Sequence, residues 1–208
     1  MREIVPDHME GEQEFFEAAY HGIPPWDIGK SQKEFVRLGR SGEIVGDVLD
    51  VGCGTGENAF FLAGLGHVVC GIDAAPTAIE IARQKARERG IPVTFLVKDA
   101  LNLNQIPRKF DTVIDSGLFH VLSDLERPCF ARNLADVLKS SGRYFMLCFS
   151  DLEPGGYGPR RVTQGEIRDT FSGGWEIRYI RPAVFENRIN TAGSKAWLSS
   201  IVKIDGKK

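Results

Sequence analysis

Short apolar runs alternate with amphipathic stretches through the middle of this chain. The apolar runs have the length and flanking residues of buried strands, and they lie at 47–51, 67–73, 92–100, 110–115 and 142–150. Between them, the spacing of apolar residues predicts helices at 58–65, 75–90 and 124–140. This alternation predicts a parallel sheet with helices on both faces, an α/β fold.

The two ends of the chain follow other patterns. Amphipathic helices are predicted at 9–22 and 34–42, joined by Pro24-Pro25-Trp26-Asp27-Ile28-Gly29. Near the other end, a short helix begins at 162–167, and strands at 175–185 and 196–204 should pair antiparallel at one sheet edge. We expect a single domain over residues 1–208, with a helical arm at 1–42 and a core at 43–208.

A glycine-rich turn follows the first predicted strand. Asp50 ends the strand, glycines occupy positions 52, 54 and 56, and a helical pattern opens at Asn58. Glycines let a ligand approach the backbone, and the amides that begin a helix favour an anion. We expect a nucleotide-like ligand with a carboxylate or phosphate. The spacing differs from the G-x-G-x-x-G/A of dinucleotide sites, and the lysine of a phosphate loop is missing.

Acidic residues recur where the predicted parallel strands end. Asp73 lies 23 residues after Asp50, and Asp99 and Asp115 follow at the ends of the next two strands. Ligands of such sheets bind at these carboxyl ends, and an acid at this spacing can accept hydrogen bonds from a ribose. The alternative for Asp73 is a cap on the helix that follows it.

The acidic residue and the x-G-x-G-x-G spacing resemble the first motif of the class I S-adenosylmethionine-dependent methyltransferases. The Pro-Pro-Trp-Asp-Ile-Gly stretch resembles the N-terminal segment of the thiopurine, halide/thiol and heterocyclic-toxin methyltransferases, which lies over the cofactor. The resemblance implies a Rossmann-like, doubly wound, seven-stranded sheet, mostly parallel with its last strands antiparallel, and an N-terminal helical lid. It also implies S-adenosylmethionine as methyl donor and S-adenosylhomocysteine as product. The cofactor-binding residues that it implies are Trp26, Gly29, Asp50, Gly52, Gly54, Gly56, Asn58, Asp73, Ala74, Asp99, Ala100 and Ser116. For Trp26, the alternative is a simple anchor of the arm.

The segment after the fourth strand bears on the methyl acceptor. It reads Asp115-Ser116-Gly117-Leu118-Phe119-His120 and lacks the Asp/Asn-Pro-Pro-aromatic motif of enzymes that methylate exocyclic amines. His120 is a candidate general base; alternatively it caps a helix or bonds the backbone. The candidate acceptor-binding residues are Tyr20, Phe119, Tyr157 and Arg160. We expect methyl transfer to S, O or N of a small aromatic or heterocyclic molecule. The alternatives are a protein or RNA methyltransferase, a nucleotide-binding relative without turnover, and an NAD-type oxidoreductase.

The amino-acid composition limits which binding partners and which cellular compartment we expect for this protein. The net charge of −2 gives no basic field for nucleic acid, and no apolar run reaches membrane-spanning length. The four cysteines, at 53, 70, 129 and 148, form no C-x-x-C pair, so neither a metal site nor a disulfide framework is indicated. We expect a cytoplasmic protein, monomeric or homodimeric, with Cys70 and Cys148 buried.

Overall fold

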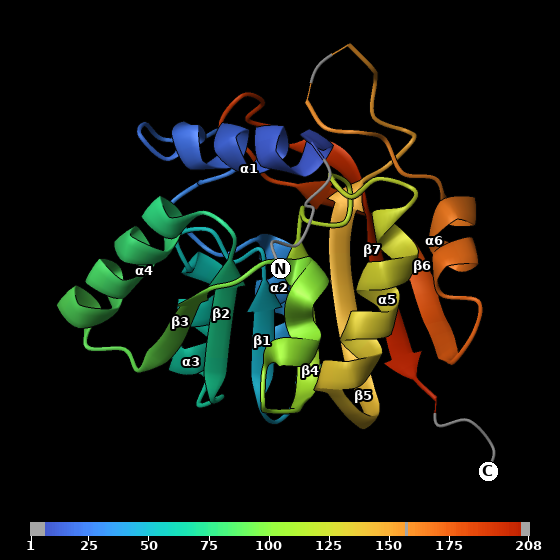
Figure 1. Ribbon diagram of the computed structural model, residues 1–208, viewed down its shortest axis with the longest axis horizontal. Coiled ribbons are helices and arrows are strands. Elements are labelled where there is room, and N and C mark those ends of the chain that lie inside the picture. Colours follow the sequence, from blue (N-terminus) through green and yellow to red (C-terminus); the bar gives the residue numbers. More distant parts are fainter. Residues whose placement is uncertain (1–6, 157, 205–208) are drawn as a thin grey trace.

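The computed structural model describes residues 7–156 and 158–204, and within them one seven-stranded sheet has the order β3-β2-β1-β4-β5-β7-β6 (Figure 1). The strands are β1 (Val48–Val51), β2 (Val69–Asp73), β3 (Val93–Val97), β4 (Phe110–Ser116), β5 (Leu138–Phe149), β6 (Trp175–Phe185) and β7 (Ser194–Lys203). The helices are α1 (Asp7–Ala19), α2 (Lys33–Arg40), α3 (Glu57–Gly64), α4 (Pro76–Arg89), α5 (Glu126–Val137) and α6 (Gln164–Thr170), with a 3-10 helix η1 (Ala100–Gln105). None of these helices is long and apolar enough to cross a membrane.

Helices cover both faces of the sheet, as the alternating pattern predicts. On one face, α2, α3 and α4 bury Phe35, Phe60 and Ile79 in one hydrophobic cluster. On the other face, α5 and α6 bury Phe130 and Ile167 in a second cluster, which η1 also joins. Burying one such side chain contributes about 1.5–3 kcal/mol, so these two clusters hold the layers together.

The strand directions confirm the predicted mixed sheet. Parallel pairing joins β3 to β2, β2 to β1, β1 to β4 and β4 to β5. The strand β7 runs antiparallel to both β5 and β6. The strand order reverses at β1 and β4, and in this topology ligands bind beside the carboxyl ends of those two strands.

Some element boundaries differ from the prediction. The helix expected at 124–140 ends at Val137, because Leu138 already pairs with Phe110 of β4 as the first residue of β5. The β4–β5 register then shifts, and Ser141 takes a φ of 57°. The first helix ends at Ala19, short of residue 22, because the backbone turns there, with the Gly22 amide bonded to the Ala19 carbonyl.

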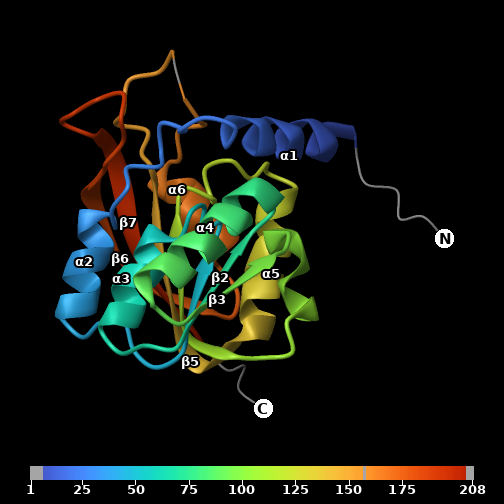
Figure 2. The ribbon, with the colours of Figure 1, turned by 90° about the vertical axis from the view of Figure 1, so that its left-hand side faces the viewer.

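The N-terminal arm crosses the end of the sheet at which the parallel strands finish. Figure 1 and Figure 2 both show α1 above this edge, away from the layers of helices that flank the sheet. From α1 the chain turns at Pro24 and Pro25 and descends through residues 26–32 to α2, which packs on one face. The arm therefore lies over the ends of the strands where the sequence places the acids.

Candidate functional site

The loop between β1 and α3 is a close-packed glycine turn. Gly54 and Gly56 have φ values of +53° and +89°, which side chains rarely adopt. A Cβ on Gly54 would lie 2.8 Å from Oη of Tyr20, and one on Gly56 would lie 2.6 Å from Cζ of Phe95. Glycine at both positions thus serves the backbone conformation and the close approach of neighbouring rings.

Asp73, at the end of β2, holds this loop in place. Its Oδ2 accepts the Gly54 amide at 2.8 Å, and its Oδ1 accepts the Ala75 amide at 2.9 Å, just before α4. Burial raises the pKa of the Asp73 carboxyl, and these two amides oppose the rise. An ionised carboxylate has about four acceptor positions. Asp73 therefore caps local backbone and still has capacity for hydroxyl groups of a ligand.

Asp50 differs from Asp73 because it has no partner. The residue is fully buried beneath the glycine loop, and neither carboxylate oxygen has a hydrogen-bond partner among the described residues. Burial, and then the charges of Asp115 and Asp73, raises the pKa of Asp50 well above its usual value, and the nearby Ala59 backbone amide only partly opposes this rise. A buried polar group without a partner is costly, so this carboxyl is suited to a cationic or hydrogen-bond-donating group of a ligand.

Asp115, near the end of β4, instead has partners for both of its oxygens. Its oxygens accept the amides of Leu118 at 2.7 Å and Phe119 at 3.0 Å, and the Tyr144 hydroxyl at 2.7 Å. Burial raises its pKa to about 7, against the effect of these three donors. The carboxyl thereby shapes the turn that leads from β4 to His120.

The N-terminal arm is hydrogen-bonded to the glycine loop. The indole of Trp26 donates to Oη of Tyr20 at 3.0 Å, and that hydroxyl faces Gly54. Asp27 accepts the hydroxyl of Thr55, a loop residue, at 2.9 Å. Trp26 also packs against Phe16 of α1, with ring centroids 5.5 Å apart. Trp26 therefore packs within the arm, and through Tyr20 it adjoins the glycine loop.

Further contacts fix the arm on the helices beside the loop. Oδ1 of Asn58, in the first turn of α3, accepts the Ser31 hydroxyl at 2.9 Å and the Gln32 amide at 3.0 Å. Glu17 of α1 accepts the amide and the hydroxyl of Thr77, at the start of α4. The sequence pattern gave no sign of these pairs, because each joins segments far apart in the chain.

His120 lies in an aromatic enclosure at the ends of β4, β5 and β6. Its ring centroid is 5.0 Å from that of Phe149 and 5.8 Å from that of Phe185, and the two phenyl rings are 5.2 Å apart. The Phe149 amide donates to Nδ1 of His120 at 3.0 Å. Burial, and then the charges of Arg161 and Arg127, lowers the pKa of His120 to about 3. The imidazole is therefore neutral at physiological pH and carries its hydrogen on Nε2.

The enclosure adjoins the glycine loop. A Cβ on Gly52 would lie 3.2 Å from Cβ of Leu118, so the turn after β4 rests directly on the loop. The arm closes the same region from above, since the Arg188 amide, just beyond β6, donates to the Pro25 carbonyl at 2.8 Å. Loop, arm and aromatic enclosure therefore form one contiguous site.

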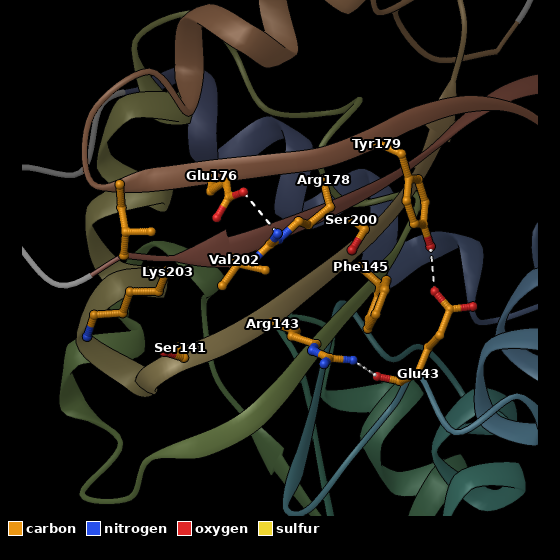
Figure 3. Close-up of a pocket in the computed structure, with 11 residues that line it drawn as sticks. Glu43, Ser141, Arg143, Phe145, Glu176, Arg178, Tyr179, Ser200, Val202 and Lys203 are labelled. Atoms are coloured by element: carbon orange, nitrogen blue, oxygen red, sulfur yellow. Dashed lines mark hydrogen bonds and ion pairs between the residues drawn. The ribbon is translucent and has the colours of Figure 1, made fainter.

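A separate hollow of about 440 Å³ lies at the opposite end of β5, β6 and β7 (Figure 3). Its polar groups bond one another: Glu43 accepts the Tyr179 hydroxyl at 3.1 Å, and its carbonyl accepts from Arg143 at 2.9 Å. Arg178 pairs with Glu176 at 3.0 Å. The hollow is remote from the glycine loop and presents no arrangement suited to the ligand of that loop.

Known proteins are similar to this chain in sequence and in fold. The methyltransferase-domain family matches residues 48–142. A 2-heptyl-1-hydroxyquinolin-4(1H)-one methyltransferase of Mycobacteroides abscessus is 38% identical over 182 residues, which cover 82% of this chain and 80% of that protein. The chain belongs to the S-adenosylmethionine-dependent methyltransferases. The predicted family, methyl donor and enzyme class are confirmed.

Solved structures agree with this assignment. One similar structure is described as "Conversion of a Disulfide Bond into a Thioacetal Group during Echinomycin Biosynthesis". It matches this chain with a TM-score of 0.84 and 37% identity, over 92% of this chain and 93% of its own. The 1,6-didemethyltoxoflavin-N1-methyltransferase of Burkholderia thailandensis has a TM-score of 0.76 over 99% of this chain and 93% of its own. Its identity of 19% shows a common fold alone.

The site fits the methyl donor on its own geometry. The unpartnered Asp50 carboxyl is suited to the amino group of the methionine part, and the glycine turn leaves room for close approach. Asp73 would hold the ribose hydroxyls with the acceptor positions that its two backbone amides leave open. When bound, S-adenosylmethionine supplies an electrophilic methyl group on a sulfonium, and the protein's task is to orient the acceptor and exclude water.

The remaining candidate cofactor-binding residues differ in how far they are buried. Ser116 is half-buried at the end of β4, whereas Gly29 and Ala74 are exposed. Asp99 caps η1 by accepting the Leu101 amide at 2.8 Å, and Ala100 is buried behind it.

Two candidate acceptor-binding residues lie away from the enclosure, and a third is not among the described residues. Phe119 is fully buried against Phe171, because the bonds of its amide to Asp115 turn the chain toward the core. Arg160 pairs with Asp124 and Glu166 instead of reaching the enclosure. Tyr157 lies outside the described residues.

Proposed function

We propose that this methyltransferase transfers the methyl group of S-adenosylmethionine to an oxygen, sulfur or nitrogen of a small aromatic or heterocyclic molecule. The observation that carries the proposal is the enclosure formed by His120, Phe149 and Phe185 beside the glycine loop. Aromatic side chains offer flat apolar faces, which suit a planar ring system. The similar Mycobacteroides abscessus protein is named for a hydroxyquinolone, a planar heterocycle, and this supports the same class of acceptor.

The arm has a part in this proposal. In-line displacement at a methyl group requires the attacking atom about 3 Å from the carbon and a site without water. We infer that residues 1–42 act as a lid on the core at 43–208, both within one domain. The hydrogen bonds of Asp27 to Thr55, and of Ser31 and Gln32 to Asn58, support this role.

The proposal also covers the cellular compartment, the type of acceptor and the oligomeric state of the protein. All four cysteines are free, which supports our inference of a reducing, cytoplasmic compartment. The net charge of −2 supports a small-molecule acceptor over nucleic acid. We expect a monomer or homodimer that acts without a metal.

A methyl-transfer screen tests the proposed function. The purified protein is incubated with S-adenosylmethionine and a panel of thiols, phenols and N-hydroxy heterocycles that includes 2-heptyl-1-hydroxyquinolin-4(1H)-one. We expect methylation of at least one planar acceptor and release of S-adenosylhomocysteine. Methylation of added protein or RNA, with no turnover on any small acceptor, would overturn the proposal in favour of a macromolecular substrate.

A further inference from the structure

The starting observation is the hydrogen bonding of the His120 ring. Nδ1 accepts the backbone amide of Phe149 at 3.0 Å, so this nitrogen has no free lone pair. Nε2 has no partner among the described residues, although His120 is only 6% exposed. Some polar atoms in this fold are fully sealed from solvent and have no partner, but Nε2 of His120 is not one of them. Nε2–H is therefore a donor without a protein partner, and it keeps some solvent accessibility among apolar rings.

The enclosure also fixes the position of the ring. Phe149 and Phe185 flank it, and a Cβ on Gly117 would lie 3.3 Å from its Cε1 atom. Glycine at position 117, with a φ of +93°, therefore allows the ring to sit against the backbone. A ring held on three sides cannot turn readily to exchange its two nitrogens, so the donor keeps its direction.

The charged groups that act on His120 are cationic, and one of them, Arg127, is paired with Glu166 at 2.9 Å. The guanidinium of Arg161 lies over the Phe149 ring, 5.2 Å from its centroid, and Arg161 and Arg127 are the charged groups that act on His120. The other neighbours of the ring, Phe149 and Phe185, do not titrate. With its pKa lowered to about 3, the imidazole cannot hold a proton taken from an acceptor.

We propose that Nε2–H of His120 donates a hydrogen bond to an anionic oxygen or sulfur of the methyl acceptor, which binds already deprotonated. This rests on the proposed function. The acceptor loses its proton to solvent before binding. A lone pair of the anion then forms the new bond to the methyl carbon, and the carbon–sulfur bond of the sulfonium breaks. Its electrons remain on sulfur, which leaves neutral S-adenosylhomocysteine and a neutral methylated product.

The proposal narrows the class of acceptor. Without a protein base, the methylated group must be acidic enough to ionise near neutral pH, as in N-hydroxy heterocycles, thiols and phenols with electron-withdrawing substituents. An aliphatic alcohol does not meet this condition. His120 is then a residue that selects for ionised acceptors and orients them.

Two substitutions separate the donor from the structural bond. His120→Asn keeps an acceptor near Nδ1 for the Phe149 amide but loses the donor at Nε2. His120→Gln places an amide N–H near Nε2 but loses the acceptor near Nδ1. We expect kcat/KM on 1-hydroxyquinolin-4(1H)-ones to fall about 10- to 100-fold in the Asn variant, the range for losing a hydrogen bond to a charged group. The Gln variant should recover most of it. A higher kcat/KM in the Asn variant than in the Gln variant would overturn the proposal.

The pH dependence provides a second test, with ring-substituted hydroxyquinolones whose hydroxyl pKa values differ. We expect log kcat/KM to rise with pH up to a midpoint that follows the pKa of each free acceptor. A general base of pKa about 3 acting on the neutral acceptor would instead give a flat profile below that midpoint, and would overturn the proposal.

A binding measurement separates failure of the His120 inference from failure of the proposed function. Absorbance spectra of the hydroxyquinolone bound to the protein–S-adenosylhomocysteine complex should show the anion even below its solution pKa. A bound neutral form, or no binding, would overturn the inference. The proposed function would fail separately, through absence of turnover on every small acceptor in the screen.

Discussion

Replacement of Asp50 by asparagine tests the central feature of the site, a buried carboxyl without a partner. Asparagine has nearly the same size and removes the ionisable group. In the ligand-free protein, Asp50 is fully buried and neither oxygen is hydrogen-bonded within the described part of the chain. We expect the substitution to stabilise the ligand-free protein and to weaken cofactor binding, which are opposite effects from one change.

The sign of the stability effect follows from the raised pKa of Asp50. A carboxyl whose pKa is higher in the folded than in the unfolded state binds more protons when folded. Stability is then full below the unfolded pKa of about 4 and falls as the pH rises toward the folded value. The gain from Asp50→Asn should thus be small near pH 4 and grow toward pH 8. Asparagine is itself a polar side chain without a partner, so the gain comes only from the ionisation that it avoids, at about 1.4 kcal/mol for each unit by which the pKa of Asp50 is raised on folding.

Thermal unfolding at several pH values, with and without S-adenosylhomocysteine, measures both effects. For a chain of this size, 1 kcal/mol corresponds to about 2–4 °C in Tm. The affinity for S-adenosylhomocysteine should fall by about 10- to 100-fold, the scale for losing a hydrogen bond to a charged group. The ligand-induced rise in Tm should shrink accordingly.

Asp111→Asn is the matched control at the other end of the sheet. Lys139 donates to Asp111 at 2.7 Å and lowers the pKa of the Asp111 carboxyl. The ionised Asp111 therefore stabilises the fold above its unfolded pKa, and this stabilisation is lost as the pH falls. This variant should lose stability at neutral pH and bind S-adenosylhomocysteine normally. The reasoning on Asp50 is refuted if Asp50→Asn lowers Tm at pH 8 and leaves the ligand affinity unchanged.

Three further substitutions probe the supporting contacts. Tyr144→Phe removes one of three donors to Asp115 and should lower the free energy of unfolding in urea by about 1–3 kcal/mol; no change would show that the bond is inconsequential. Asp73→Ala should weaken S-adenosylhomocysteine binding by about 2–3 kcal/mol in calorimetry and also lower Tm, because it frees the glycine-loop amide; unchanged affinity would limit Asp73 to capping. Asn58→Ala releases the arm and should speed protease cutting at 23–29, with protection by S-adenosylhomocysteine reduced; equal cutting rates would argue against a lid.

Much of the fold could be predicted from local sequence. The apolar runs, the amphipathic periods and the alternate glycines before Asn58 report backbone preferences that neighbouring residues impose. The strand at 175–185 was predicted with the observed bounds, and its antiparallel partner within two residues. The end of α5 was missed because residues 138–140 continue a helical pattern, while pairing with β4 makes them strand.

Within the site, residue types were predictable and their states were not. The acids at the ends of the strands followed from the pattern, yet Asp50, Asp73 and Asp115 differ in what they bond. Asp50 has no partner, Asp73 holds two amides, and Asp115 holds two amides and a hydroxyl. These differences depend on burial and on distant residues such as Tyr144.

The sequence alone therefore determined the class of fold and the place of the cofactor loop, because glycine spacing and strand-end acids are local features. Only the tertiary structure decided how the arm meets the loop and which nitrogen of His120 is free. Those outcomes depend on contacts such as Asp27 with Thr55 and Phe149 with His120, across 28 and 29 residues of chain. No local preference specifies such pairs, since they form only when the packed layers bring separate segments together.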